Sequence, residues 1–174
     1  MPNSTNPQTP PTKVIGTRQP DVSYTDRHAV RVIALDAAGA VALVHVQKGS
    51  YYKLPGGGVE AAEDHAVAAA REVQEETGAV VAVRPGDGCV ASTEEFRTDL
   101  HQISYAYVAD VVEAVGRPAL TEEEVADGLT HEWVPIHQAL EKMNGAQPTS
   151  ELGRFIRERD VYLLGQAAEK LGIL

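Results

Sequence analysis

The stretch that decides the fold is residues 57–79, GGVEAAEDHAVAAAREVQEETGA, in which a glycine loop leads into an acidic segment. Its content of Ala and Glu favours a helix over residues 64–77. Because an α-helix has about 3.6 residues per turn, Glu72, Glu75 and Glu76 share one face and repel one another. Oxygen ligands that converge on one point are what Mg²⁺ or Mn²⁺ requires. The helix therefore predicts a divalent-metal site, with a solvated acidic surface as the alternative.

The loop before this helix has three consecutive glycines behind a proline, at Pro55–Gly58. Glycine has no side chain, so the backbone can approach a ligand closely and its carbonyl groups can reach a metal ion. Asp64 is expected to cap the start of the helix, and Gly78 is expected just past its last turn. Loop and helix thus form one unit whose two parts can face the same ion.

Eight residues of this unit are in register with the Nudix box, G-x5-E-x7-R-E-U-x-E-E-x-G-U, in which U is a bulky aliphatic residue. They are Gly57, Glu63, Arg71, Glu72, Val73, Glu75, Glu76 and Gly78. Only the last position departs from the pattern, because Ala79 stands where a larger aliphatic residue is usual. The chain therefore resembles the Nudix hydrolase family, and the resemblance extends from about Thr25 to Met143.

The resemblance implies a fold and a set of metal ligands. The fold is of the α/β class, a Nudix-type α/β/α sandwich around a mixed β-sheet. Glu72 and Glu76 would be the principal ligands of Mg²⁺, for which Mn²⁺ would be able to substitute. Glu75 would be a further ligand or would orient water. Gly57 would offer its carbonyl group near the metal.

The same resemblance implies support roles for the other matching residues. Arg71 and Glu63 would brace the helix against the loop through a salt bridge. Gly78 would support the site at the end of the helix. These three residues are therefore expected to position the carboxylates rather than to react.

The implied reaction is attack of water on one phosphorus of a diphosphate, with the cation neutralising charge on the bridging oxygen. A general base must accept a proton, and the resemblance leaves open which glutamate does so. Within the helix the candidates are Glu75 and Glu76. On a later loop they are the glutamates at 122–124, of which Glu123 is selected. Residues 94–95 are further alternatives.

The expected substrate is a nucleoside diphosphate linked to another moiety, first of all a nucleoside triphosphate, oxidised ones included. ADP-ribose, nucleotide sugars and dinucleoside polyphosphates are alternatives. A hypothesis of another class is a module that senses a nucleotide without cutting it, although such modules often lose the carboxylates that this chain keeps. Tyr51, Tyr52 and Phe96 are candidates for stacking on a base, with packing in the core as the alternative.

Alternating and apolar stretches predict the remaining elements. Strands are expected at residues 29–35, 41–46, 80–83, 102–112 and 131–135, the first two as a hairpin, and helices at 137–143 and 150–171. The chain then divides into a Pro-rich N-terminal tail at residues 1–24, a Nudix hydrolase domain at 25–144, and a C-terminal helix at 145–174. That helix is expected to pack on the domain or at an interface, and a homodimer is possible.

Composition limits the classes of function. The chain has 174 residues, of which 43% are hydrophobic and 23% charged, as in one globular domain. Its net charge of −10 argues against a nucleic-acid polymer as partner, whereas a small nucleotide-like substrate can bind through divalent cations. Cys89 is the single cysteine, which suits a reducing compartment. No apolar run is long enough to predict a membrane span, so a cytoplasmic location is expected.

Overall fold

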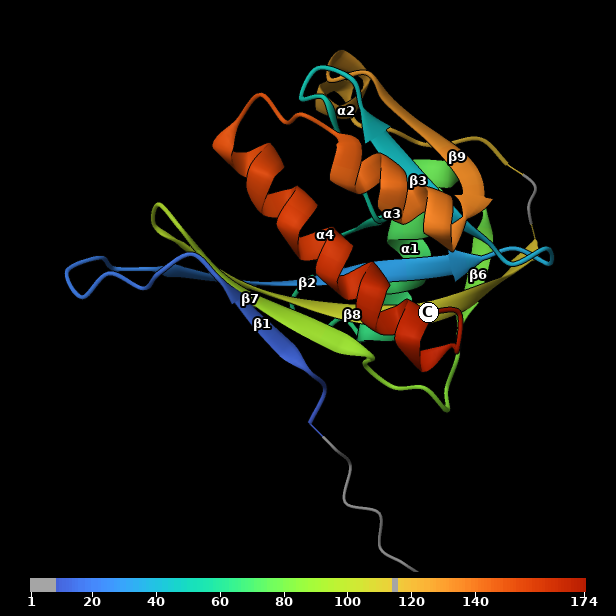
Figure 1. Cartoon of the computed structure of the whole chain (residues 1–174), viewed down its shortest axis with the longest axis horizontal. Helices are drawn as coiled ribbons and strands as arrows, with labels where there is room; N and C mark the ends of the chain where they lie inside the picture. The colour runs from blue at the N-terminus through green and yellow to red at the C-terminus, as the bar shows by residue number, and fades with distance from the viewer. Residues whose placement is uncertain (1–8, 114–115) are drawn as a thin grey trace, which may run out of the picture.

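A mixed β-sheet with helices on both of its faces forms the body of the protein (Figure 1). The structure is a computed structural model that describes residues 9–113 and 116–174. Its elements are β1 (Thr12–Ile15), β2 (Thr25–Leu35), β3 (Ala40–Val46), β4 (Tyr51–Lys53), β5 (Gly56–Gly58), α1 (His65–Thr77), β6 (Val80–Val83), β7 (Ala91–Arg97), β8 (Leu100–Glu113), α2 (Glu122–Ala126), β9 (Leu129–Pro135), α3 (Ile136–Gly145) and α4 (Glu151–Lys170). The predicted α/β class with a central mixed sheet is confirmed.

The sheet is organised around the parallel pair β2 and β8. Their register runs from Thr25 opposite Leu100 to Leu35 opposite Asp110. The strand order is β1-β7-β8-β2-β3-β4, while β5 pairs with β2, β6 with β8, and β9 with β3. The β1–β7 pair is also parallel, and the other pairs are antiparallel. Residues 29–35 of β2 are buried throughout, as expected for a strand that is covered on both faces.

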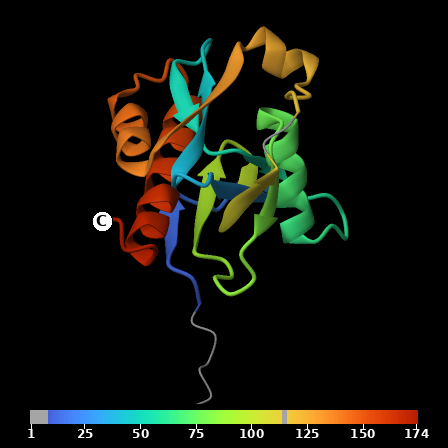
Figure 2. The same ribbon diagram turned by 90° about the vertical axis from the view of Figure 1, so that its right-hand side faces the viewer.

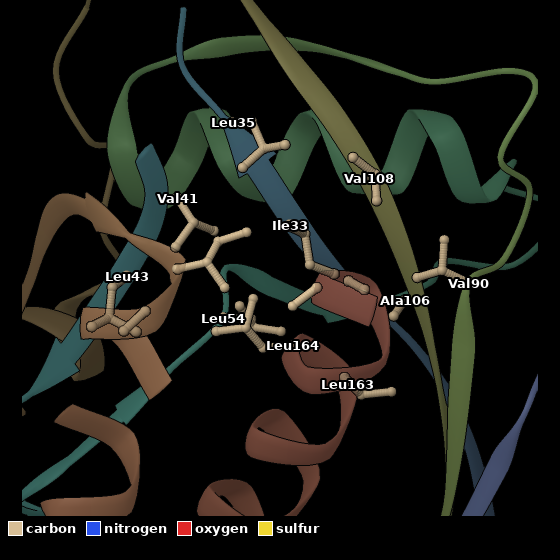
Figure 3. Packing of buried hydrophobic residues seen from close by; sticks show 14 of the residues in the cluster. Ile33, Leu35, Val41, Leu43, Leu54, Val90, Ala106, Val108, Leu163 and Leu164 are labelled. Atoms are coloured by element: carbon tan, nitrogen blue, oxygen red, sulfur yellow. The ribbon is translucent and has the colours of Figure 1, made fainter. Parts of the chain in front are cut away.

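Two helical layers cover the two faces of the sheet (Figure 2). Because side chains alternate along a strand, Val30 and Val32 of β2 face α1, whereas Arg31 and Ile33 face α4. On the α1 side, Val73 is among the helix residues that complete the cluster. On the other side the fully buried Leu163 and Leu164 of α4 pack with Ile33 and Val108 (Figure 3). The predicted C-terminal helix thus packs on the domain.

Helix α1 begins and ends at the two expected residues. The Asp64 side chain accepts a hydrogen bond of 2.8 Å from the backbone N–H of Ala66. Gly78 follows the last turn with a φ of 78°, and its N–H donates to the carbonyl oxygen of Gln74. That conformation is left-handed, which glycine adopts at little cost. The ends of α1 are therefore fixed by local chemistry.

The N-terminal tail is the largest correction to the predicted organisation. Residues 12–15 form β1, which pairs in parallel with β7, and Ile15 is buried. This strand is anchored by backbone pairing with residues about eighty positions away, which the local Pro-rich composition does not reveal. Residues 1–8 of the predicted tail lie outside the described residues.

Other differences concern short elements. β7 was not predicted, and the glutamates at 122–124, expected on a loop, lie in the short helix α2. The predicted strands at 80–83, 102–112 and 131–135 correspond to β6, β8 and β9, and the helices at 137–143 and 150–171 to α3 and α4. The expected hairpin is present through the pair Leu35 and Val41. Among the described residues, no helix combines the length and apolarity needed to cross a membrane.

Candidate active site

A cleft of about 370 Å³ lies beside the C-terminal half of α1. The glycine strand β5, helix α2, strand β2 and helix α4 supply its other walls. The cleft brings together six of the predicted site residues, which are Gly57, Glu72, Glu75, Glu76, Glu123 and Tyr51. The predicted metal ligands and the predicted general bases therefore line one common cleft.

Arg71 joins the helix to the glycine loop. Its Nε lies 2.9 Å from Glu63 Oε1 and its Nη2 lies 3.0 Å from Glu63 Oε2, so the predicted salt bridge is present and bidentate. The same Nη2 donates to the carbonyl oxygen of Gly58 at 3.1 Å. Hydrogen bonds from Arg71 and from the backbone N–H of Glu60 lower the pKa of Glu63 to about 2. The guanidinium thus fixes the loop against α1.

Glu72 is held between Arg71 and the glycine strand. Arg71 Nη1 donates to Glu72 Oε1 at 2.8 Å. On the other side, a Cβ atom added to Gly57 would lie 2.3 Å from Glu72 Oε1. No residue with a side chain fits at this position without moving the carboxylate. The backbone of Gly57 therefore lies directly against the Glu72 carboxylate.

Glu76 is the most enclosed of the three helix carboxylates, with 2% of its side chain exposed. Lys53 of β4 donates to Glu76 Oε1 at 2.7 Å, and the backbone N–H of Gly56 donates to Oε2 at 3.2 Å. Burial raises the pKa of Glu76, and the positive charge of Lys53 opposes that shift. The carboxylate is thus held by one cation and one backbone donor at the floor of the cleft.

Glu75 differs from its two neighbours because 45% of its side chain is exposed. Its closest cationic partner is Arg71, whose Nη1 lies 3.6 Å from Glu75 Oε2. Partial burial raises the pKa of Glu75, and the negative charge of Glu72 raises it further. Glu75 is therefore the carboxylate of α1 that is least committed to other protein groups.

The donor set suits a hard divalent cation. Three carboxylates of α1 line the cleft, that of Glu72 lies against the backbone of Gly57, and Mg²⁺ prefers oxygen ligands of this kind. Within residues 9–113 and 116–174, no three acidic, histidine or cysteine side chains already form a metal-binding cluster. Instead Glu72 and Glu76 are turned to Arg71 and Lys53. A cation that binds here would compete with these two side chains for the carboxylate oxygens.

Helix α2 brings Glu123 and Glu124 to the cleft, whereas Glu122 does not line it. Glu124 is part of a capping box: Thr121 N–H donates to its carboxylate at 2.8 Å, and its own N–H donates to the Thr121 hydroxyl. Glu124 is therefore occupied in capping the start of α2, which leaves Glu123 as the cleft-lining glutamate of α2 whose carboxylate has no hydrogen bond or ion pair among the described residues. The alternatives at 94–95 do not line the cleft: Glu94 bonds to His101, and Glu95 accepts from Gln102.

The three aromatic candidates are separated by the fold. Tyr51 lines the cleft and is buried. Tyr52 does not line it, because its ring stacks on His45 at 4.4 Å between centroids and packs at the edge of the core. Phe96 also lies outside the cleft, since its ring stacks on His101 at 4.8 Å and meets Tyr24 edge-on. Only Tyr51 is thus in a position to contact a ligand in this cleft.

Four basic residues that line the cleft were not among the predicted site residues: Arg27, Arg31, Lys53 and Arg159. Arg31 could have been noticed, because it is the single charged residue in the apolar run 29–35. Arg159 lies three residues after Ile156 and four before Leu163 in the predicted last helix, so it shares their apolar face, where a charge is unusual. Lys53 precedes the glycine loop and has no comparable signal. Asp127, after α2, was also missed.

Comparison with known proteins identifies the family of the chain. A family model described as the NUDIX domain matches residues 25–154. No curated protein sequence matches the chain. Because the family model covers most of the chain, it establishes the family independently of structural likeness.

Three solved structures illustrate the proteins that share this fold. The MutT protein from Methanosarcina mazei Go1 is 20% identical over 86% of this chain and 98% of its own, with a TM-score of 0.58. An Ap4A hydrolase from C. elegans is 15% identical over 85% of this chain and 99% of its own, with a TM-score of 0.58. A UDP-X diphosphatase is 18% identical over 88% of this chain and 68% of its own, with a TM-score of 0.56.

At these identities the structural likeness establishes the fold alone. The family rests on the matching model over residues 25–154, within which the glycine strand and the carboxylates of α1 line one cleft. Members of this family generally use divalent metal ions to cut small nucleotide-like substrates. The chain belongs to the Nudix family and is a Nudix pyrophosphohydrolase.

Proposed function

We propose that the protein is a Mg²⁺-dependent hydrolase, with Mn²⁺ able to substitute, that cleaves the pyrophosphate linkage of a nucleoside diphosphate linked to another moiety. Nucleoside triphosphates, oxidised ones included, are the first choice of substrate. The observation that carries this proposal is the contact between the Glu72 carboxylate and the backbone of Gly57 at the edge of the cleft. This contact places the Glu72 carboxylate against the glycine strand at the cleft, where a diphosphate can reach it.

In this proposal Glu72 and Glu76 hold the cation, Glu75 is a further ligand or orients water, and Gly57 adds its carbonyl oxygen. When bound, the cation neutralises charge on the diphosphate and lowers the pKa of water. Arg71 and Glu63 have a positioning role, because their salt bridge holds the loop at a fixed distance from the helix. Gly78 supports the site by ending α1 directly after the last carboxylate.

For the proton acceptor we favour Glu123 over Glu75 and Glu76. It reaches the cleft from α2, a different element from the one that bears the metal ligands, and its neighbour Glu124 is engaged in the helix cap. The Glu→Gln variant of the general base should lose the acidic limb of the profile of kcat/KM against pH. Comparing the three variants tests the choice, and a limb that disappears with Glu75→Gln or Glu76→Gln instead overturns it.

A substrate screen tests the proposed reaction. The panel contains nucleoside triphosphates, an oxidised nucleoside triphosphate, ADP-ribose, a UDP-linked sugar and Ap4A, each with Mg²⁺ or Mn²⁺ and with the products separated. The last two are included because structures with this fold are described as a UDP-X diphosphatase and an Ap4A hydrolase. We expect cleavage at a phosphoanhydride bond that stops when the metal is chelated. Tight nucleotide binding without any product would favour the nucleotide sensor instead.

The cellular setting of the proposal is a reducing one. We propose a cytoplasmic protein that acts on small molecules and has no nucleic-acid polymer as partner, in keeping with its net charge of −10 and its single cysteine. A homodimer stays a prediction. Sedimentation at micromolar concentration tests it, and the mass of one chain would rule it out.

A further inference from the structure

A second, smaller pocket adjoins the cleft. Its volume is about 250 Å³, and it shares Arg27, Arg31 and Arg159 with the cleft. The charged side chains that line this pocket are four arginines and one glutamate: Arg27, Arg31, Arg97, Arg159 and Glu95. We call it the arginine pocket. In a chain with a net charge of −10, this excess of positive charge is a local departure from the rest of the molecule. The pocket is therefore suited to an anion.

The arginines reach this pocket because of the strand register. Arg27 and Arg31 are four residues apart on β2, so their side chains leave the same face of the sheet. A Cβ atom added to Gly56 would lie 3.0 Å from Arg31 Nη1, and one added to Gly58 would lie 3.3 Å from Arg27 Nη2. Both guanidinium groups therefore lie along the glycine strand whose middle residue contacts Glu72. One phosphate chain can reach the carboxylates and the arginines together.

Arg31 is buried but incompletely satisfied. It is 6% exposed, and its Nη1 donates to the carbonyl oxygen of Val30 at 3.3 Å. Its Nε has no hydrogen-bond partner among the described residues. Burial, followed by the positive charge of Arg159, lowers the pKa of Arg31 to about 10, so the group stays charged at neutral pH. A buried charged donor with no partner is rare in folded proteins, and a ligand is one of the ways to satisfy it.

The nearby carboxylates are engaged by other groups. Asp160 accepts from Arg159 Nε at 2.6 Å and from the backbone N–H of Leu54 at 2.9 Å. Glu95 accepts from Gln102 Nε2 at 3.1 Å and lies 3.8 Å from Arg159 Nη1. Arg159 is thus a member of a closed network that holds α4 against the sheet. Arg31 lies beside this network, and its Nε donates to no group among the described residues.

We propose that Arg31, together with Arg27, binds a phosphoryl group of the substrate beyond the two that the scissile linkage joins. The substrate is then a nucleoside polyphosphate with at least three phosphates in its chain. Two-phosphate compounds such as ADP-ribose and nucleotide sugars leave the arginine pocket empty. This inference rests on the proposed function and chooses among the substrate classes that it leaves open.

Steady-state kinetics of Arg31→Met on two substrates test the inference. For a nucleoside triphosphate we expect kcat/KM to fall by about 10-fold to 100-fold, since a charged hydrogen bond to phosphate is lost. For ADP-ribose or a UDP-linked sugar we expect little change. Arg31→Lys should recover part of the loss because it keeps the charge. An equal fall on both classes of substrate overturns the inference, because Arg31 would then contact the scissile diphosphate itself.

A matched control and a binding measurement complete the test. Arg154→Met removes an exposed arginine of α4 that lines neither the cleft nor the arginine pocket, and should change neither activity. The melting temperature of each variant separates unfolding from loss of contact. Calorimetry with inorganic tripolyphosphate, without metal, should give weaker binding to Arg31→Met than to the wild type.

The two proposals fail separately. If the enzyme cleaves diphosphates but Arg31→Met and the wild type show the same preference between substrates, the inference alone is overturned. If no compound is cleaved with either metal, the proposed function falls. The tripolyphosphate measurement then still decides the inference, and equal binding to wild type and Arg31→Met overturns it.

Discussion

The three glutamates of α1 stand within two helical turns of one another, yet each meets a different electrostatic environment. Glu72 is paired with Arg71, Glu76 is buried with Lys53, and Glu75 is nearly half exposed. Like charges at this spacing repel by a few tenths of a kcal/mol per pair at an exposed surface, and more where water is excluded. The two cationic partners offset that repulsion. The cluster can therefore stay folded and still offer its oxygens to a stronger cation.

Glu63 allows a test of the Arg71 salt bridge through pH. Its pKa falls from the ordinary 4.5 to about 2, so the carboxylate stabilises the fold above pH 4.5 and that contribution is lost as pH falls toward 2. Glu63→Gln should lower the melting temperature at neutral pH, and the difference from the wild type should shrink between those two pH values. Glu60→Gln, at an exposed neighbouring side chain, is the control. A difference that is constant with pH would contradict the assigned cause.

At the scale of elements, α1 is positioned by its ends as well as by its apolar face. Gly78 adopts a φ of 78°, and a Cβ atom there would lie 2.7 Å from the carbonyl oxygen of Gly116. Gly78→Ala should destabilise the protein by at least about 1 kcal/mol, since an L-residue in the left-handed region is strained and backbone must also move. Urea denaturation measures the change. Gly86→Ala, where the added atom meets nothing within 4 Å, should be close to neutral, and equal effects would contradict the explanation.

The elements that could be predicted from sequence are those with a local signal. β2, β3 and β8 have long apolar or alternating runs, and α1 has a cap residue at each end. β1 and β7 have no such signal, because they are stabilised by pairing between distant segments. The glycine strand β5 is too short to show a period and becomes a strand only through its pairing with β2. Local patterns thus predict the sheet's centre better than its edges.

The candidate site likewise contains residues that local sequence patterns predict and residues that they do not. The residues of the glycine loop and α1 could be predicted because they lie in one segment with fixed spacing. Lys53, Arg31 and Arg159 come from β4, β2 and α4, and only the folded sheet and its helical cover bring them to the cleft. Tyr52 and Phe96 have the same composition signal as Tyr51 but point to other neighbours. The direction of each side chain in the fold, which residue type does not reveal, therefore determines which of these aromatic residues lines the cleft.

At the scale of the whole molecule, α4 links the core to the cleft. Leu163 and Leu164 are fully buried against the sheet, while Arg159 of the same helix lines the cleft and Asp160 accepts from the backbone N–H of Leu54. The apolar residues of α4, a helix that was predicted to pack on the domain or at an interface, are thus used within the chain's own core. Nothing in this packing requires a second copy, so the homodimer rests on its own measurement.

Leu163→Ala tests whether α4 is integral to the domain. The side chain is fully buried, so its truncation should lower the free energy of unfolding by about 2–5 kcal/mol. Urea denaturation with a two-state fit measures this change. Leu174→Ala, at a side chain that is 66% exposed, should alter stability by less than about 0.5 kcal/mol. A loss below about 1 kcal/mol for Leu163→Ala would mean that the domain is stable without the packing of α4.

The most direct test of the account is the rate of phosphoanhydride hydrolysis by the wild type, Glu76→Gln and Glu141→Gln at saturating Mg²⁺. Glu76 lies at the floor of the cleft, whereas Glu141 is an exposed residue of α3, so both variants remove one negative charge. We expect Glu76→Gln to stay folded and lose at least about 100-fold in kcat, with Glu141→Gln close to the wild type. Turnover near the wild-type rate in folded Glu76→Gln would contradict the assignment of α1 as the catalytic helix.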